Sequence, residues 1–254
     1  MAVAYCSNAS LFFVLLLASV STAAAIELDG GRRKPPPAAP ITPPPPPGLG
    51  VFDYYILAIQ WSISFCNDVT LKQKDRCKAT SVPILPDFFT MHGVWPSKRV
   101  GKPVRSGELF DVTQIASSFL KMKDYWPSAK EFSKSPTILT YQSFWAHEWE
   151  EHGAESGLTQ KDYFALACRL FEKANNTVIY PYFKERAGTT INIAAMNQAF
   201  TPFGIPAAKC NNGPSGRQLL ELKFNISKSG DFQNYIGAVE KQYICPAVVH
   251  LPAK

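Results

Sequence analysis

The chain has 254 residues, of which 46% are hydrophobic and 18% charged, and its formal net charge at pH 7 is +6. After the first twenty residues no segment is apolar for long enough to cross a membrane, and no internal repeat is present, which excludes a polytopic membrane protein and a repeat array. The mild basic charge favours polyanionic partners but identifies none, because a solvated surface excess gives the same net charge.

The first fifty residues predict a leader and a connector. Residues 11–20 are small and apolar, too few for a mature membrane helix, and residues 22–25 offer a small-residue cleavage site. We therefore predict a signal peptide at 1–25; a retained anchor is the alternative, because a basic n-region is missing. Nine of the 21 prolines lie between Pro35 and Pro47. Residues 26–50 are thus predicted to be an extended proline-rich linker or propeptide, with a docking site for a proline-binding domain as the alternative.

Residues 51–254 have the size of one domain with a substantial core. Two apolar segments predict strands at 54–61 and 88–95, the second ending at Pro96, and an alternating pattern predicts a half-buried strand at 217–226. Helical periodicity covers 113–123, 143–152 and 159–175. Because strands and helices do not alternate regularly, we predict an α+β fold, a central antiparallel sheet with flanking helices, rather than a doubly wound fold.

Five cysteines remain once the leader is removed, and in an exported chain most of them are expected to be oxidised. The odd number leaves at least one free or paired between chains. Cys66 with Cys77 closes a short loop, and Cys210 with Cys245 would join parts of the C-terminal region. Cys168 lies in an amphipathic helical pattern and is predicted to be a buried thiol.

Two glycosylation sequons, at Asn175 and Asn225, become usable only if the chain enters the secretory route.

Three of the four histidines lie in two short segments, Phe-Thr-Met-His-Gly-Val-Trp-Pro at 89–96 and Phe-Trp-Ala-His-Glu-Trp-Glu-Glu-His-Gly at 144–153. Clustered imidazoles indicate proton transfer or metal binding. A zinc-binding helix needs histidines four residues apart, whereas His147 and His152 are five apart and diverge by about 140° around a helix. We therefore predict a proton-transfer site that holds no metal; packing of isolated histidines is the alternative.

These segments resemble the two active-site segments of the ribonuclease T2 family, whose plant members usually read His-Gly-Leu-Trp-Pro and Phe-Trp-x-His-Glu-Trp-x-Lys-His-Gly. Gln60-Trp61 and Phe65-Cys66 resemble the entry strand of the same family. The resemblance spans residues 52–246 and implies the ribonuclease T2-type α+β fold. It further implies cofactor-free cleavage of single-stranded RNA, in which the 2′-hydroxyl attacks the adjacent phosphorus to give a 2′,3′-cyclic phosphate.

The resemblance also implies roles for individual side chains. His152 is expected to be the base for the 2′-hydroxyl and His92 the acid for the departing 5′-oxygen. His147 would help to hold the phosphate, and Glu148 would orient or polarise the cluster.

Three further residues are expected to contact the bases, which single-stranded RNA leaves available for stacking. Trp95 is the candidate on one side of the scissile bond, and Gln60 and Phe144 are the candidates on the other. Core packing is an equally good explanation of Trp95 and Phe144.

Glu151 departs from the resemblance, because the family has a lysine there. Loss of one stabilising donor at such a site costs about 3–4 kcal/mol, or roughly 100- to 1,000-fold in rate. Solvent, a neighbouring cation or protonation of Glu151 would reduce this cost.

The cysteine pattern is also thinner than in the family, and a Cys210–Cys245 bridge would be a rewired pair. The leading interpretation is a monomeric, secreted (extracellular or vacuolar) endoribonuclease with no membrane association, attenuated by Glu151. The alternative is a catalytically weak or inactive relative that serves in storage, defence or binding. A recognition role in pollen rejection is a third possibility, for which nothing in the sequence selects.

Overall fold

The computed structural model describes residues 50–254. The predicted signal peptide at 1–25 lies outside the described residues, as does the predicted proline-rich segment at 26–50 except for its last residue. Between residues 50 and 254, none of the helices has both the length and the apolar character needed to traverse a lipid bilayer.

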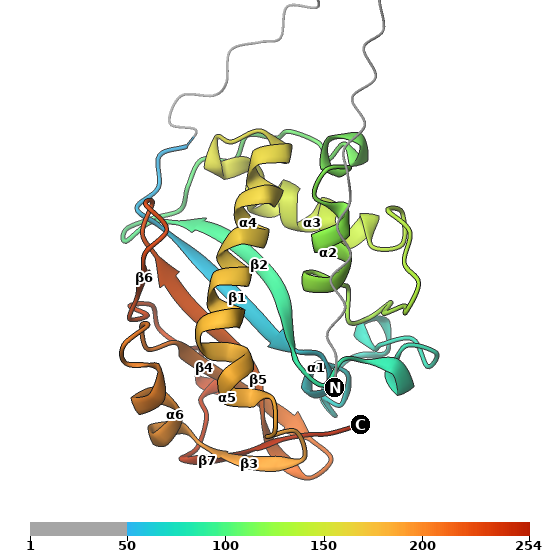
Figure 1. Ribbon diagram of the computed structural model, residues 1–254, viewed down its shortest axis with the longest axis vertical. Helices are drawn as coiled ribbons and strands as arrows, with labels where there is room; N and C mark the ends of the chain where they lie inside the picture. Colours follow the sequence, from blue (N-terminus) through green and yellow to red (C-terminus); the bar gives the residue numbers. More distant parts are fainter. Residues whose placement is uncertain (1–49) are drawn as a thin grey trace, which may run out of the picture. The chain divides into compact units, whose positions relative to one another are not determined.

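A seven-stranded sheet forms the centre of the described domain (Figure 1). Its main path runs β2-β1-β5-β7-β3, and β4 and β6 also pair with β5. The strands are β1 (Tyr54–Trp61), β2 (Phe89–Ser97), β3 (Thr189–Asn192), β4 (Ala207–Gly213), β5 (Gly216–Ile226), β6 (Phe232–Gln233) and β7 (Val248–Leu251). Every pairing is antiparallel except for one parallel contact between β5 and β7. The predicted α+β fold with a central antiparallel sheet is therefore confirmed, with one parallel contact added.

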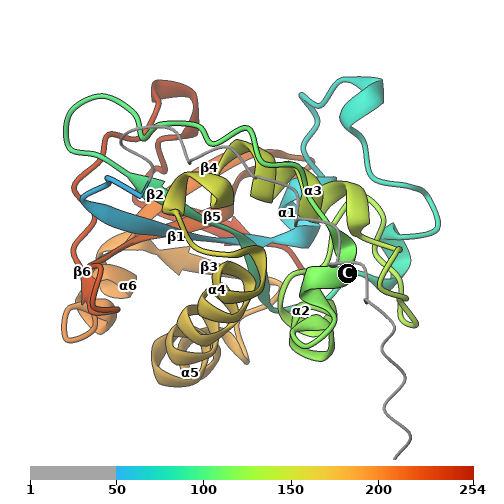
Figure 2. The ribbon, with the colours of Figure 1, turned by 90° about the horizontal axis from the view of Figure 1, so that it is seen from above.

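Helices flank this sheet. They are α1 (Ser62–Cys66), α2 (Phe119–Tyr125), α3 (Gln142–Glu151), α4 (Gln160–Ala174), α5 (Tyr180–Phe183) and α6 (Ile193–Phe200). In Figure 1 the long helix α4 crosses in front of β1 and β2, and Figure 2 shows α2, α4 and α5 on the same side of the sheet. A π-helical turn (Asn175–Ile179) joins α4 to α5.

Helix α4 illustrates how the sequence specifies these elements. The Thr159 side chain accepts a hydrogen bond from the Asp162 backbone N–H and so caps the first turn. Buried residues then recur every three or four positions, the spacing of one helical face, at Tyr163, Phe164, Ala167, Leu170, Phe171 and Ala174. This apolar face packs on the sheet and on α2.

Two predicted elements have different limits in the structure. Strand β2 continues through Pro96 to Ser97, where it was expected to stop. Within the described residues β2 pairs only with β1, and an edge strand tolerates the missing N–H of a proline. The helix predicted at 113–123 is instead a 3-10 turn (Val112–Ile115), capped by Asp111, followed by the shorter helix α2.

Strand β5 departs from the half-buried alternation predicted for 217–226. Its register with β4 shifts, so that Leu220 has no partner there, and both faces of the strand are largely covered. Asn225 is only 1% exposed, between β1 and β6 in the sheet. Burial of Asn225 disfavours the predicted glycosylation there, because a glycan would not fit between these strands in the folded domain. Asn175 is half-buried at the start of the π-helical turn, and its glycosylation stays a prediction.

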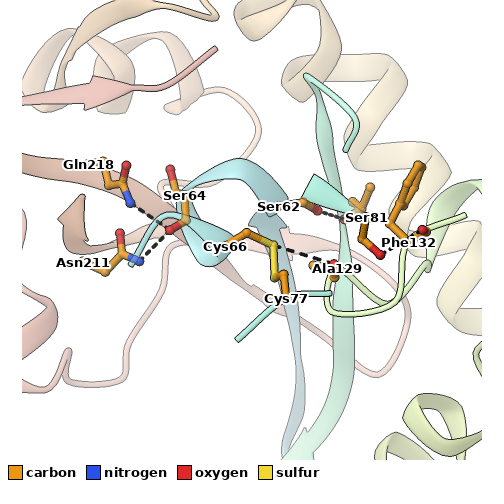
Figure 3. Close-up of a disulfide and its surroundings, with 10 residues drawn as sticks. Ser62, Ser64, Cys66, Cys77, Ser81, Ala129, Phe132, Asn211 and Gln218 are labelled. Atoms are coloured by element: carbon orange, nitrogen blue, oxygen red, sulfur yellow. Dashed lines mark hydrogen bonds between the residues drawn. A yellow bond between two sulfur atoms is a disulfide. The ribbon is translucent and has the colours of Figure 1, made fainter. Parts of the chain in front are cut away.

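Two disulfides join Cys66 to Cys77 and Cys210 to Cys245, the pairs suggested by the sequence. Figure 3 shows the first, at the end of α1. Cys168 is buried in α4 without a partner among the described cysteines, and burial raises its pKa to about 12. This thiol is thus neutral and part of the core.

The two bridges are expected to differ in their contribution to stability. Cys210–Cys245 closes a separation of 35 residues and Cys66–Cys77 one of 11. Chain entropy then gives about 4 kcal/mol for the longer loop and about 3 kcal/mol for the shorter one. We expect the double alanine variant of the C-terminal pair to lose more free energy of unfolding in urea, with Cys168→Ala as the free-thiol control. Equal losses for both pairs would contradict the loop-length argument.

Candidate active site

His92 occupies a β-bulge in β2. Gly93 pairs with Ala58 and Met91 with Ile59, so His92 has no partner on β1. A bulge of this kind turns the side chain of the extra residue away from the regular alternation. The indole N–H of Trp126 donates to the freed carbonyl of His92 at 2.7 Å, which holds the bulge in place.

The residue after His92 must be glycine for steric reasons. A Cβ on Gly93 would lie 2.2 Å from the Glu148 carboxylate and 2.2 Å from the Trp95 indole nitrogen. These two groups are hydrogen bonded, with Trp95 Nε1 donating to Glu148 Oε2 at 2.9 Å. Any larger residue at position 93 would therefore break the contact between β2 and α3.

The imidazole of His92 lies between two buried carboxylates. Its Nδ1–H donates to Glu221 Oε2 on β5 at 2.6 Å, and its Nε2 lies 3.8 Å from Glu148 Oε1 on α3. Glu148 and Glu221 are 1% and 5% exposed, respectively. Neither carboxylate has free access to water, so each depends on its partners for charge compensation.

Burial and charge act in opposite directions on these groups. Burial alone would lower the pKa of His92, but the hydrogen bond and charge of Glu221, with the charge of Glu148, raise that pKa above its ordinary value. Burial raises the pKa of Glu148, although His92 and Trp95 oppose it. Burial also raises the pKa of Glu221, but the hydrogen bond and charge of His92, with the charges of Lys223 and Lys209, together lower that pKa below its ordinary value. His92 therefore stays protonated to a higher pH than a free imidazole, with Glu221 as its counter-ion.

His152 has the opposite protonation preference. It follows the last residue of α3, and its backbone N–H bonds to the Glu148 carbonyl. Burial, followed by the nearby His147 and His92, lowers its pKa to about 4. At neutral pH His152 is therefore an unprotonated imidazole, able to accept a proton.

His147 on α3 and His152 just after it open into different cavities. The larger one, about 600 Å³, is lined by Gln60, Phe144, His92, His147 and Glu148 among others. The smaller one, about 300 Å³, is lined by Trp95, Arg105, Glu151 and His152 among others. This separation agrees with the divergence expected from the five-residue spacing of the two histidines.

Trp95 lines the smaller cavity and lies beside both His92 and His152. Its ring centroid is 5.3 Å from that of His92 and 5.1 Å from that of His152. The Lys223 ammonium lies over the same ring, 4.7 Å from the centroid. Trp95 is half-buried and Phe144 likewise, so both combine core packing with an exposed surface that a ligand can reach.

The Glu151 carboxylate is paired with a cation. Both guanidinium end nitrogens of Arg105 donate to its carboxylate, and Arg105 Nε lies 4.0 Å from Glu155 Oε1. The hydrogen bond to Arg105 is the main cause that lowers the pKa of Glu151. Of the compensations considered from the sequence, the structure therefore provides a neighbouring cation, whereas protonation of Glu151 is disfavoured.

Several groups that contact this site were not predicted from the sequence. Glu221, Lys223 and Lys209 come from β4 and β5, with Lys223 Nζ 3.6 Å and Lys209 Nζ 3.9 Å from Glu221 Oε1. The sequence shows a polar face on the strand at 217–226. It does not show that this strand pairs with β1 in the register that places it opposite Gln60. Arg105 lies on a loop without any pattern that points to the site. Between residues 50 and 254, no group of three or more His, Cys, Asp or Glu side chains is arranged to hold a metal ion.

Comparison with known proteins places this geometry in context. Residues 52–235 match the model of the Ribonuclease T2 family. Ribonuclease 1 of Arabidopsis thaliana is 30% identical over 212 residues, which cover 78% of this chain and 82% of the relative. Ribonuclease DdI of Dictyostelium discoideum is 30% identical over 178 residues, covering 65% and 70% of the two chains.

Solved structures show the same fold. Ribonuclease MC1 from bitter gourd seeds superposes with a TM-score of 0.59 at 23% identity, covering 78% of this chain and 100% of the other. An RNase-related protein from Calystegia sepium gives a TM-score of 0.59 at 22% identity, covering 79% and 97%.

The opposite protonation preferences of His92 and His152 can be measured directly. In an NMR titration of the ring protons, we expect His152 to titrate near pH 4 and His92 above 6.5, the ordinary value. Glu221→Gln should lower the pKa of His92, because it removes the counter-ion that stabilises the imidazolium. Signals are assigned with His92→Asn and His152→Asn. Titration of His152 near 6.5 would contradict the desolvated environment described above.

Proposed function

Because the chain belongs to the ribonuclease T2 family, we propose that it is an endoribonuclease that cleaves single-stranded RNA by metal-independent transphosphorylation, with a 2′,3′-cyclic phosphate as the first product. The single observation that carries this proposal is the acid–base pair made by His92 and His152. Their environments move the two pKa values in opposite directions, as a general acid and a general base at one site require.

The proposed reaction uses each histidine in the protonation state that its surroundings favour. Neutral His152 accepts the proton of the 2′-hydroxyl, whose oxygen attacks the phosphorus. Imidazolium His92 gives its proton to the departing 5′-oxygen, so the P–O5′ bond breaks as the P–O2′ bond forms. His147 contributes to phosphate binding, and Glu148 fixes the position of His92 and Trp95.

This assignment also orients the RNA. The nucleotide that carries the attacking 2′-hydroxyl belongs on the side of His152, in the smaller cavity with Trp95 as its stacking surface. The leaving nucleotide belongs on the side of His92, in the larger cavity with Gln60 and Phe144. Stacking on aromatic side chains suits single-stranded RNA, whose bases are not paired.

Glu151 attenuates the proposed reaction less than its charge alone suggests. A free carboxylate near the phosphate would oppose the negative charge that develops on the phosphoryl oxygens. Arg105 holds this carboxylate in an ion pair and lines the same cavity as His152. We therefore propose a ribonuclease of reduced rather than abolished activity.

The second candidate is a catalytically weak or silent relative that acts in storage, defence or binding. The carboxylate at position 151, where the family has a lysine, is the observation that favours it.

For both candidate functions, the two disulfides and the predicted leader support a secreted or vacuolar protein, which we propose to be a monomer. The proposed arrangement is a signal peptide at 1–25, a proline-rich segment at 26–50 and one domain at 51–254.

The proposed function is tested with the purified, oxidised protein and single-stranded RNA between pH 4 and 8 in the presence of EDTA. We expect cleavage that His92→Ala and His152→Ala each reduce by about 100-fold or more. Glu151→Lys should increase the rate by about tenfold. That is less than the loss of a whole donor would imply, because Arg105 already compensates the carboxylate.

The two histidine variants differ in their risk of unfolding. His92→Ala leaves two buried carboxylates without their partner, so its fold is checked by a thermal melt. His152→Ala carries less of this risk, because His152 has no such partners. No cleavage by the folded parent at any pH would favour the storage or binding candidate. Activity that appears only in Glu151→Lys would show that one charge separates the two functions.

The compensation of Glu151 is tested by a double-mutant cycle. Arg105→Ala should lower kcat/KM on the order of tenfold in the parent, because it leaves an unpaired carboxylate beside the phosphate. In a Glu151→Gln background the same change should have a much smaller effect. Equal effects in both backgrounds would mean that Arg105 acts independently of Glu151, and Arg99→Ala, on the same long loop, serves as the matched control.

A further inference from the structure

The larger cavity has lining residues that the proposed reaction does not use. Four of them are cationic side chains, Lys74, Arg76, Lys78 and Lys130, which we call the basic wall. His92 lines the same cavity, so the basic wall lies on the leaving-nucleotide side of the site.

The charge of the basic wall is only partly compensated. Lys78 Nζ lies 2.8 Å from Glu131, and Lys130 Nζ lies 3.2 Å from Asp75. The other two cations form no ion pair with any residue between 50 and 254. Two positive charges therefore remain free in the cavity that also holds the proposed acid.

The basic wall is also held in a fixed position. The segment 74–78 carries three of the four cations, and the Cys66–Cys77 disulfide joins this segment to the end of α1 (Figure 3). Cys66 Sγ also lies 3.7 Å from the Ala129 carbonyl oxygen. The backbone N–H of Lys78 donates to the Lys130 carbonyl at 2.9 Å, which joins the two segments that supply the cations. Cations on a fixed frame lose less conformational entropy when they bind an anion.

We propose that the basic wall binds the phosphate on the 3′ side of the leaving nucleotide, as a second phosphate site for single-stranded RNA. This inference rests on the proposed function, because the orientation of the strand follows from His92 acting on the 5′-oxygen. Gln60 and Phe144 line the same cavity as the basic wall, so a nucleotide whose base lay against them would have its next phosphate in the cavity that these cations line. Phosphates are the groups that lysine and arginine side chains bind irrespective of base.

The experiment compares substrates that differ by this one phosphate. An equimolar mixture of the sixteen dinucleoside monophosphates (NpN) and the same mixture with a 3′-terminal phosphate (NpNp) are cleaved at low salt with EDTA. We expect the parent to favour NpNp by about tenfold in kcat/KM, which corresponds to about 1.4 kcal/mol. In the double variant Lys74→Ala/Arg76→Ala this ratio should fall towards 1, and added salt should lower it in the parent.

Two further variants make the result specific. Lys161→Ala removes an exposed cation on α4 outside the cavity and should keep the parent's ratio. Glu131→Gln releases Lys78 from its ion pair and should increase the ratio. A parent that consumes NpN and NpNp at the same rate, or a double variant that retains the parent's ratio, would overturn the inference while leaving the proposed function intact.

Failure of the proposed function is recognised separately. If the folded parent cleaves neither mixture, binding of the thymidine dinucleotides TpT and TpTp, which lack the 2′-hydroxyl, decides the inference. Tighter binding of TpTp that is lost in Lys74→Ala/Arg76→Ala supports the second phosphate site. Equal binding of the two dinucleotides overturns it.

Discussion

The contact of His92 with Glu221 and Glu148 organises the whole site. Two carboxylates, one carried by the sheet and one by a helix, are almost completely buried, and a single imidazole lies between them. Buried carboxylates are tolerated only when they are paired and hydrogen bonded, so the positions of α3, β2 and β5 are mutually dependent. The same arrangement gives His92 its affinity for a proton. Structural pairing and the proposed acid function are therefore one property of this contact.

Aromatic side chains fix the geometry around this contact. The bulge at His92 is held by the indole of Trp126, and the hydroxyl of Tyr163 donates to the Val94 carbonyl at 2.7 Å, two residues further along β2. Both aromatic residues are fully buried, so their N–H and O–H groups have few alternative partners. Core packing thus sets the backbone of β2 on both sides of the bulge. A core substitution that moved either ring would displace the imidazole without touching it.

The sequence predicted the fold class, β1 and the helices α3 and α4 well, because each has a clear periodicity or a recognisable motif. It also predicted which histidines cluster. It did not predict Glu221, because the contact with His92 depends on strand register and on a bulge, and neither has a local signature in the residues concerned. Arg105 was missed because a loop residue can reach Glu151 only in the folded chain. The helix expected at 113–123 failed for a local reason, since Asp111 caps a separate 3-10 turn before α2 begins.

The cavity of His152 and the cavity of His92 are lined by different charged groups. On the side of His152, the cation of Arg105 is bound by Glu151 and approached by Glu155, whereas Lys98 and Lys102, which line the same cavity, form no ion pair within residues 50–254. On the side of His92, the basic wall keeps two uncompensated cations. The lysine that the family places at position 151 would act at the scissile phosphate itself, whereas the basic wall acts on the strand beyond it. Cations placed as in the basic wall support binding of a longer strand more than they support the transition state, since only charge near the reacting phosphoryl oxygens gains strength as the reaction proceeds.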